Sequence, residues 1–283
     1  RTPALSRSTV DRDAATREDD AALAAAWEKA RVLVVQDGHA AVGDSGIDLV
    51  FVDAADAPAG ERLYLGRDDE AAYFAVGADF PRRLGTRPVG LRDVGALLSD
   101  RDAGLLTHAV GLLNWHAAHS RCSRCGAATE VVRGGAIRRC IADGSEHFPR
   151  TDPAVIMLVT DGADRCVLGR QAIWPAGRYS TLAGFVEPGE SAEQAVVREV
   201  AEETGLAVRD VRYRGSQPWP FPSSLMLGFR AICDGSLLPI PADAELEDVR
   251  WFTRDELRVD NGTVLPGSIS IAWCLISDWL DEA

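Results

Sequence analysis

The chain has 283 residues, of which 46% are hydrophobic and 26% charged, and its formal net charge at pH 7 is −13. This length and composition are typical of a globular protein with one large domain or two to three smaller ones. The negative charge argues against broad binding to DNA, RNA or an anionic membrane, because such partners require a basic face. It leaves open the recognition of one short nucleotide through a local site.

The sequence contains no targeting or membrane-spanning pattern. No apolar run approaches the ~20 residues that cross a bilayer, and residues 1–20 are polar and charged. We therefore expect a cytoplasmic protein. A disulfide framework would be unusual in a chain of this size and location, and Cys166, Cys233 and Cys274 lie in apolar runs that predict small core residues.

The first part of the chain predicts a folded α+β domain that supports the rest. An alanine-rich helix is followed by four strand-like runs and then by two helical patterns. The expected ranges are 20–28 for the helix, 32–36, 47–52, 62–65 and 72–76 for the strands, and 91–98 and 102–118 for the later helices. We find no internal repeat and no catalytic constellation here.

A cysteine cluster follows in "SRCSRCGAATEVVRGGAIRRCIADGSEHFPRTDP". Cys122, Cys125 and Cys140 have the spacing of a zinc ribbon, and a segment of ~30 residues without a core of its own can fold around such a metal. A complete pattern would place a fourth cysteine at 143, where this sequence has Asp143. Asp143 offers an oxygen and His147 a nitrogen, and register favours Asp143. The alternative is a relic ribbon that no longer binds metal.

The chain then returns to alternating strands and helices. "AVIMLVT" and "CVLGRQA" predict two buried strands joined by a "DGAD" hairpin, and "YSTLAGF" predicts a third. Ser191 with Gln194 forms a capping box at the start of a short helix, and Gly205 suits the left-handed position at its end. This helix carries most of the acidic residues in its neighbourhood.

Three glutamates of this helix, Glu199, Glu202 and Glu203, fall at positions i, i+3 and i+4, and therefore on one face. Like charges at this spacing cost a few tenths of a kcal/mol per pair, so a plain surface helix gains nothing from them. The whole stretch reads "GFVEPGESAEQAVVREVAEETGL" from residue 184 to 206. Its glycines, glutamates and arginine match the Nudix box at every defining position.

The protein therefore resembles the Nudix hydrolases, enzymes that cleave a nucleoside diphosphate linked to another moiety. A carboxylate cluster alone would repel the pyrophosphate, whereas the same cluster with bound Mg²⁺ or Mn²⁺ presents a cation to it. The resemblance implies that Glu199 and Glu203 are metal ligands, that Glu202 is a ligand or the water-activating base, and that the Ala183 carbonyl is a further ligand. The alternative is a solvated acidic helix face.

The resemblance and the charge pattern also give the neighbouring arginine a role. Arg198 is expected to pair with a neighbouring glutamate such as Glu190 and to fix its carboxylate. Further along, "DAELEDVRWF" places Glu245 where the family keeps another metal-binding glutamate, with Glu247 as the alternative if the register differs.

A second motif, "SQPWPFPSSLM" at 216–226, combines prolines with Trp219 and Phe221. Proline removes a ladder donor, so this stretch cannot be a regular inner strand. Physics alone leaves two readings open, a stiff aromatic wall for flat heterocycles and a proline-rich core connection. The pattern resembles that of the NADH pyrophosphatase branch of the Nudix hydrolases, which also has a zinc ribbon and a degenerate N-terminal domain before its catalytic domain. The missing fourth cysteine is the departure from that branch.

The resemblance implies hydrolysis of NAD(H) to nicotinamide mononucleotide and AMP, and removal of NAD caps from RNA 5′ ends. It implies base stacking by Phe148 and Phe185 and a backbone contact from Ala272. The remaining dinucleotide contacts are expected from Gln217, Pro218, Trp219, Pro220, Phe221, Pro222, Ser223 and Ser224.

The expected fold is α+β, namely a Nudix α/β/α sandwich at 151–283 with a ribbon at 119–150 and a Nudix-like supporting domain at 1–118. The family further implies a homodimer, catalytic Mg²⁺ or Mn²⁺ and structural Zn²⁺; neither DNA nor a membrane is an expected partner. A local basic surface for RNA could come only from the ribbon arginines, whose alternative is a solvated surface. They are Arg133, Arg138, Arg139 and Arg150.

Two rival functions remain at this point. The first is another Nudix activity, on ADP-ribose, an ADP-sugar or a nucleoside triphosphate. The second is a catalytically silent protein whose ribbon binds RNA ends or a partner, against which the intact set of glutamates argues.

Overall fold

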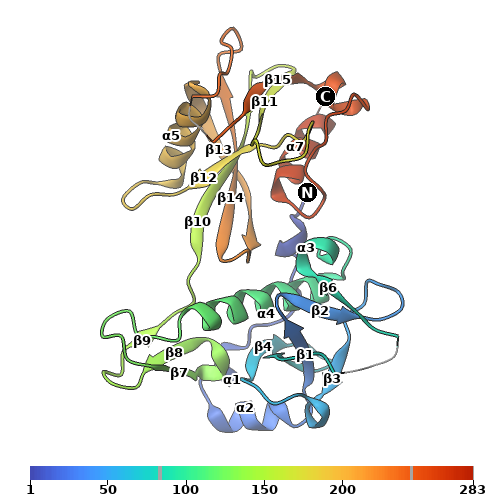
Figure 1. Ribbon diagram of the computed structural model, residues 1–283, viewed down its shortest axis with the longest axis vertical. Coiled ribbons are helices and arrows are strands. Elements are labelled where there is room, and N and C mark those ends of the chain that lie inside the picture. Colours follow the sequence, from blue (N-terminus) through green and yellow to red (C-terminus); the bar gives the residue numbers. More distant parts are fainter. Residues whose placement is uncertain (82–84, 243–244, 283) are drawn as a thin grey trace. The chain divides into compact units, whose positions relative to one another are not determined.

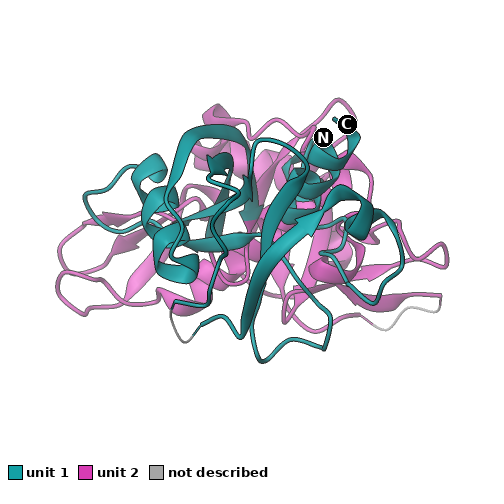
Figure 2. Cartoon of the chain, turned by 90° about the horizontal axis from the view of Figure 1, so that it is seen from above, with its two compact units in different colours: residues 1–6, 152–218, 224–283 teal, residues 7–151, 219–223 magenta. Residues whose placement is uncertain are grey.

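The computed structural model describes residues 1–81, 85–242 and 245–282. Contacts divide the chain into two compact units, which Figure 2 colours separately. The N-terminal unit comprises residues 7–151 and 219–223, and the C-terminal unit comprises residues 1–6, 152–218 and 224–283. A five-residue piece of the proline-rich motif therefore belongs to the N-terminal unit.

The C-terminal unit is built on a six-stranded mixed sheet in the order β13-β14-β10-β11-β15, with β12 also paired to β10 (Figure 1). Strand β10 is parallel to β14 and antiparallel to β11 and β12. The elements are η1 (Ala4–Ser6), β10 (Asp152–Thr160), β11 (Arg165–Arg170), β12 (Leu182–Phe185), α5 (Ala192–Thr204), β13 (Val208–Trp219), β14 (Ser224–Cys233), β15 (Asp248–Thr253), α6 (Arg254–Arg258) and α7 (Ile271–Asp281).

Helices cover both faces of this sheet because β10 is apolar on both sides. Val155 and Met157 belong to a core that includes the buried residues of α5, whereas Ile156 and Leu158 belong to a core that includes those of α7. Successive side chains of a strand point to opposite faces, so the two cores lie on opposite sides of the sheet. The expected α/β/α sandwich is confirmed.

The N-terminal unit contains a second six-stranded sheet and the ribbon. The sheet has the order β4-β5-β1-β2-β6, with β3 also paired to β1. The elements are α1 (Ala14–Arg17), α2 (Asp20–Trp27), β1 (Arg31–Gln36), β2 (His39–Val42), β3 (Phe51–Asp53), η2 (Ala54–Asp56), β4 (Leu63–Arg67), β5 (Ala72–Gly77), β6 (Arg87–Gly90), α3 (Leu91–Val94), α4 (Asp100–Ala118), β7 (Thr129–Val132), η3 (Arg133–Gly135), β8 (Ile137–Cys140) and β9 (Glu146–His147).

The two sheets have the same topology. In each, one central strand is parallel to one neighbour and antiparallel to two others, and β1, β5, β2 and β3 correspond to β10, β14, β11 and β12. Helix α4 contacts β1 and β5 as α7 contacts β10 and β14. The repeat relates the two units and lies in strand pairing and not in residue identity, whereas the sequence shows no repeat within the first part of the chain.

One element has no counterpart in the N-terminal unit. Between β12 and β13 the C-terminal unit has the long acidic helix α5, whereas only the three-residue turn η2 lies between β3 and β4. The N-terminal unit thus has the sheet without the acidic helix.

Two sequence-based boundaries differ from the structure. The strand expected at 47–52 is limited to β3, since Gly46 has a φ of 77° and a turn precedes the strand. The helix expected at 91–98 ends at Val94, followed by Gly95 as its C-cap. The edge position of β13 accounts for its tolerance of Pro218.

None of the helices within the described residues combines the length and apolarity that a bilayer span requires.

Candidate active site and zinc centre

Local capping interactions fix where helix α5 begins and ends. The Ser191 hydroxyl accepts from the Gln194 amide at 3.2 Å, and the Gln194 side chain accepts from the Ser191 amide at 2.8 Å. Gly205 ends the helix with a φ of 71°, in the left-handed region. Because both ends of α5 are fixed, the turn that carries Glu199, Glu202 and Glu203 has a defined position against β12.

The three helix glutamates differ in exposure. Glu203 is 3% exposed, whereas the side chains of Glu199 and Glu202 are 14% and 54% exposed. A solvated acidic face would expose all three. Burial of a carboxylate is unfavourable without a compensating interaction, so Glu203 does not belong to a solvated acidic face.

Gly184, at the start of the box, makes room for Glu199. A Cβ at residue 184 would lie 1.9 Å from the Glu199 carboxylate carbon and 2.0 Å from its Oε1. The backbone of β12 and this carboxylate are therefore in direct contact. The adjacent residue Ala183 lies on the same strand, paired with Ile156, so its carbonyl belongs to the same small region.

Arg198 connects the acidic residues of the box. Its Nη2 donates to Glu190 Oε1 at 2.6 Å and to the Phe185 carbonyl at 2.8 Å. Its Nη1 donates to Glu199 and to Glu202, each at 2.8 Å. One planar guanidinium thus orients three carboxylates and the end of β12.

Two glutamates of the box have pKa values that are shifted in opposite directions. The Arg198 guanidinium lowers the pKa of Glu190 below its usual value. Burial raises the pKa of Glu199, with further contributions from the charges of Glu202 and Glu245, against the lowering effect of Arg198. A carboxylate held near other carboxylates with partial burial is the environment that a divalent cation stabilises.

Glu245 and Glu247 have different surroundings. Glu245 accepts from Gln171 Nε2 at 2.9 Å and is close enough to Glu199 to raise its pKa. Glu247 forms an ion pair with Arg170. Of the two, Glu245 is the one whose charge acts on the box. The donor set of the box consists of oxygens alone, which fits Mg²⁺ or Mn²⁺ and not a thiophilic metal.

Two of the residues expected to contact substrate are turned into the protein. Gln217 is fully buried, and its Nε2 donates to the Ile269 carbonyl at 2.6 Å. Ala272 is 1% exposed, and its amide donates to the N-cap hydroxyl of Ser270 at 3.1 Å. Gln217 therefore positions its neighbours, and the Ala272 amide serves the helix cap.

The aromatic part of the proline-rich motif is held by side chains of the N-terminal unit. Asn114 Nδ2 donates to the Pro220 carbonyl at 3.0 Å and to the Pro222 carbonyl at 3.3 Å. The Arg92 guanidinium lies 4.3 Å from the Phe221 ring centroid and 5.5 Å from that of Trp219. The two rings meet edge to face, with centroids 5.0 Å apart.

The other candidate substrate residues are accessible in varying degree. Phe148 is 66% exposed and Phe185 is 60% exposed, which is unusual for phenylalanine and suits rings that await a stacking partner. In the motif itself, Pro220 is buried like Gln217; Pro218 and Pro222 are exposed, and Ser223 and Ser224 are partly buried.

The ribbon brings its candidate ligands together. One ligand atom from each of Cys122, Cys125, Cys140 and Asp143 lies within 4.8 Å of all the others. The Cys125 and Cys140 sulfurs are 3.5 Å apart, and the Cys122 sulfur is 4.0 Å from Asp143 Oδ2. Sulfurs bound at about 2.3 Å in a tetrahedron are separated by similar distances, so the cluster fits zinc.

Ser145 supports this cluster and connects it to His147. The Ser145 hydroxyl and amide donate to Asp143 Oδ1 at 2.6 and 2.9 Å. The same hydroxyl lies 3.5 Å from the Cys122 sulfur, and this contact lowers the pKa of Cys122 to about 6. His147 Nε2 lies 3.3 Å from the Ser145 hydroxyl, which places His147 outside the set of four.

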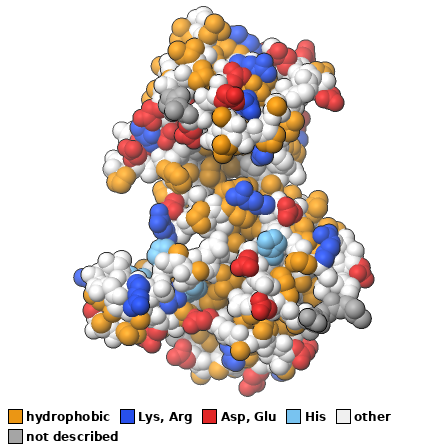
Figure 3. Space-filling model, viewed as in Figure 1, with side chains coloured by type: hydrophobic (Ala, Val, Ile, Leu, Met, Phe, Trp, Pro, Cys, Tyr) orange, Lys and Arg blue, Asp and Glu red, His pale blue; other side chains and the backbone are white. Residues whose placement is uncertain are grey.

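The ribbon arginines proposed for RNA are engaged within the unit. Arg138 is 8% exposed; its Nε donates to Thr129 Oγ1 at 2.6 Å and its Nη1 to His116 Nδ1 at 3.0 Å. Arg133 and Arg139 both pair with Glu146. Figure 3 shows acidic and basic side chains intermingled on the viewed face, without a continuous basic surface. These contacts favour a structural role for Arg138.

Sequence reasoning missed Arg92, Asn114 and Ser145. The first two act on residues more than a hundred positions away, and neither lies in a motif. Ser145 had one local signal, its place two residues after Asp143, where the backbone amide commonly closes an Asx turn by donating to the aspartate side chain.

Family comparisons match the chain in three consecutive segments. The NADH pyrophosphatase-like rudimentary NUDIX domain matches residues 15–115, the NADH pyrophosphatase zinc ribbon domain matches 117–148, and the NUDIX domain matches 150–271.

Individual proteins are also similar. The NAD-capped RNA hydrolase NudC of Mycobacterium bovis is 43% identical, covering 98% of this chain and 94% of its own length. The human NAD-capped RNA hydrolase NUDT12 is 37% identical, covering 83% of this chain and 56% of its own length. Among solved structures, a NUDIX hydrolase from Nitrosomonas europaea is 23% identical with a TM-score of 0.47, covering 58% of this chain and 91% of that one.

Proposed function

Because the chain belongs to the NADH pyrophosphatase family of Nudix hydrolases, we propose that it hydrolyses the pyrophosphate of NAD(H) to the nicotinamide mononucleotide and AMP. We extend the proposal to the removal of NAD caps from RNA 5′ ends, the activity named for the relatives. The observation that carries it is the carboxylate of Glu199, held against Gly184 beside two further helix glutamates.

The donor set fits a divalent cation. Glu199, Glu202, Glu203, Glu245 and the Ala183 carbonyl would hold Mg²⁺ or Mn²⁺. When bound, the cation lowers the pKa of a water and offsets the charge of the pyrophosphate.

The residues themselves orient the reacting groups. Arg198 keeps the carboxylates of Glu190, Glu199 and Glu202 in fixed directions through five hydrogen bonds to them and to Phe185. In this proposal Glu202, the most exposed of the three helix glutamates, binds the cation or accepts the proton of the attacking water. Glu203 acts as a ligand from its buried position.

The dinucleotide is proposed to contact both aromatic positions and the proline-rich motif. Phe148 and Phe185 stack on bases, and Trp219 and Phe221 form a flat wall that Arg92 and Asn114 hold in place. Gln217, Pro220 and Ala272 are buried and contribute by shaping the site from inside, and the remaining contacts come from Pro218, Pro222, Ser223 and Ser224.

We further propose structural zinc on Cys122, Cys125, Cys140 and Asp143, for which the mutual distances of the ligand atoms are the support. The functional domains are proposed at 1–118, 119–150 and 151–283, close to the segments that the families match. A homodimer in the cytoplasm is the proposed state of the protein.

Substrate choice is tested by measuring turnover of NADH, ADP-ribose and a nucleoside triphosphate at equal concentration with Mg²⁺ or Mn²⁺, with products identified by mass. We expect NADH to be preferred and to give two mononucleotides. Preference for ADP-ribose would overturn the substrate assignment. A wild-type protein that is inert with both cations would instead support the silent RNA-end binder.

A further inference from the structure

The C-terminal unit contains a cavity of about 430 Å³ at the end of the sheet away from the acidic helix residues. Its wall includes Thr160, at the last position of β10, and Trp279 of α7. Gly184 pairs with Val155 near the start of the same strand, so at about 3.3 Å per residue the cavity lies roughly 15 Å further along β10. It is therefore distinct from the Nudix box.

Basic side chains dominate this cavity although the chain as a whole is acidic. Four arginines and two acidic residues contribute to its wall. They are Arg212, Arg214, Arg230 and Arg254 on the one hand, and Asp210 and Glu282 on the other. In a protein of net charge −13 such a concentration of positive charge is local, and it favours an anionic ligand.

The Arg230 guanidinium uses only part of its hydrogen-bonding capacity. Its side chain is 14% exposed, and its Nη1 donates to Glu282 Oε1 at 2.6 Å. Its Nε and Nη2 are buried and have no hydrogen-bond partner within the part of the chain that the structure describes. Leaving a buried charged donor unmatched is unfavourable, and an added acceptor that reached these nitrogens would remove that penalty.

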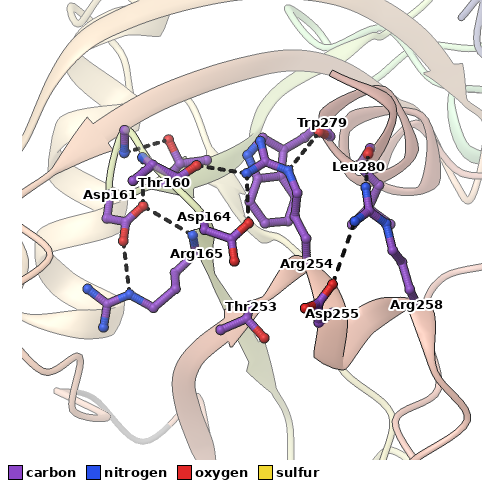
Figure 4. Close-up of polar contacts among 12 residues, drawn as sticks. Thr160, Asp161, Asp164, Arg165, Thr253, Arg254, Asp255, Arg258, Trp279 and Leu280 are labelled. Atoms are coloured by element: carbon purple, nitrogen blue, oxygen red, sulfur yellow. Dashed lines mark hydrogen bonds and ion pairs between the residues drawn. The ribbon is translucent and has the colours of Figure 1, made fainter. Parts of the chain in front are cut away.

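Arg212 and Arg254 have opposite roles in the wall. Arg254 donates to the Ala163 carbonyl at 2.8 Å and to Asp164 at 3.1 Å, and it stacks on Trp279 (Figure 4). It is therefore committed to the fold. Arg212 is exposed and has no ion-pair partner among the residues described, so its guanidinium is available to a ligand.

The corresponding place in the N-terminal unit provides an internal comparison. A cavity of about 540 Å³ lies at the ends of β1 and β5 beside α4, the counterparts of β10, β14 and α7. Its wall contains Asp37 and Asp79 and, among the described residues, no arginine. The shared topology thus forms a cavity at this position without requiring arginines, so those of the C-terminal unit are an added feature.

We propose that the arginine cavity binds a phosphoryl group, with Arg212 and Arg230 as the donors and Glu282 as the carboxylate that competes for them. Guanidinium groups match the oxygens of phosphate through paired hydrogen bonds. The group could belong to the phosphodiester chain that follows an NAD cap, a source that rests on the proposed function, or to a small phosphorylated ligand. In both cases the chemistry recognised is the same.

Calorimetric titration with two probes, inorganic pyrophosphate and a 5′-phosphorylated hexaribonucleotide, tests this in buffer without added Mg²⁺ or Mn²⁺. We expect Arg212→Gln to weaken binding about tenfold, as for a lost charged hydrogen bond. Glu282→Gln should strengthen it, because the competing carboxylate is removed. Arg178→Gln, the same change at an exposed arginine of the C-terminal unit outside the cavity, should leave it unaltered.

The two probes separate the sources. Tighter binding of the hexanucleotide than of pyrophosphate, lost in Arg212→Gln, indicates RNA, and equal binding indicates a small ligand. The proposal is overturned if the wild type binds neither probe saturably, or if Arg212→Gln and Arg178→Gln bind alike. Hydrolysis of free NADH is unaffected by all three changes, so a failure of the proposed function would leave the binding result intact.

Discussion

At the residue scale, the contact between Gly184 and Glu199 is the tightest constraint on the candidate site. Only hydrogen fits where the β12 backbone meets the carboxylate, since a Cβ would lie 1.9 Å from the carboxylate carbon. The glycine is thus required by a close approach and not by a turn.

Gly184→Ala should displace Glu199 and lower kcat for NADH by about 100-fold, because a shift of about 1 Å in a catalytic group has an effect of that size. The melting temperature of the protein should change little. The matched control is Gly267→Ala, where an added Cβ would meet nothing within 4 Å. Full activity in Gly184→Ala would show that the position of Glu199 is unimportant.

Asp143 is the second residue that decides a question the sequence left open. Its carboxylate lies with three sulfurs, whereas His147 is held by Ser145 outside the set. Asp143→Ala should weaken zinc binding by at least about tenfold. Metal content after competition with a chelator measures this, with exposed Asp69→Ala as the control. A wild-type protein with far less than one zinc per chain would identify a relic ribbon.

Among the helices and strands, those fixed by contacts between residues close in sequence could be predicted, and those that depend on distant contacts could not. Helix α5 was expected from its capping box, its apolar stripe and Gly205, all of which act within a few residues, and each is present in the structure. The support of the ribbon by α4 was not expected, because it depends on contacts between distant residues. His116 of α4 accepts from Arg138 of β8 and donates to the Gly135 carbonyl.

This contact makes the N-terminal unit sensitive to pH. Burial lowers the pKa of His116 to about 4, with a smaller contribution from Arg138. The stabilising neutral form is fully present above the ordinary pKa of about 6.5 and is lost as pH falls towards the folded value. Between about pH 7.5 and pH 5 the stability should fall by about 2 kcal/mol from this group.

His116→Gln keeps an acceptor and a donor but cannot be protonated. Urea unfolding of both proteins at the two pH values should show a smaller acid loss in the variant, by that same amount. All other titrating groups are common to both chains and cancel in the comparison. An equal loss in the two proteins would mean that His116 is not held neutral.

At the scale of the whole molecule, the sequence predicted three consecutive parts and the family, because the Nudix box and the cysteines are local patterns. It could not predict that residues 219–223 are counted with the N-terminal unit. The family resemblance implied a Nudix-like N-terminal domain, but the residue pattern alone could not show the repeated sheet topology, since very different apolar residues satisfy the same pairing. Among its described residues the N-terminal unit has no equivalent of α5, and its Arg92 and Asn114 contact the aromatic motif.

Asn114→Ala tests that role. Removing two hydrogen bonds to the motif should raise KM for NADH about tenfold, with a smaller effect on kcat. Steady-state kinetics would show this split. The control is Asn261→Ala in the C-terminal unit, whose side chain donates to the Glu256 carbonyl. An unchanged KM in Asn114→Ala would indicate that the proline-rich motif is a structural connection and does not bind the substrate.

We infer that the clustered glutamates hold a divalent cation for the pyrophosphate. Binding of Mn²⁺, followed by electron paramagnetic resonance in the wild type, Glu199→Gln and Glu193→Gln, measures this property. We expect saturable binding that weakens at least about tenfold in Glu199→Gln and is unaltered in Glu193→Gln, an exposed glutamate of the same helix. Equal binding in all three proteins, or none in the wild type, would contradict it.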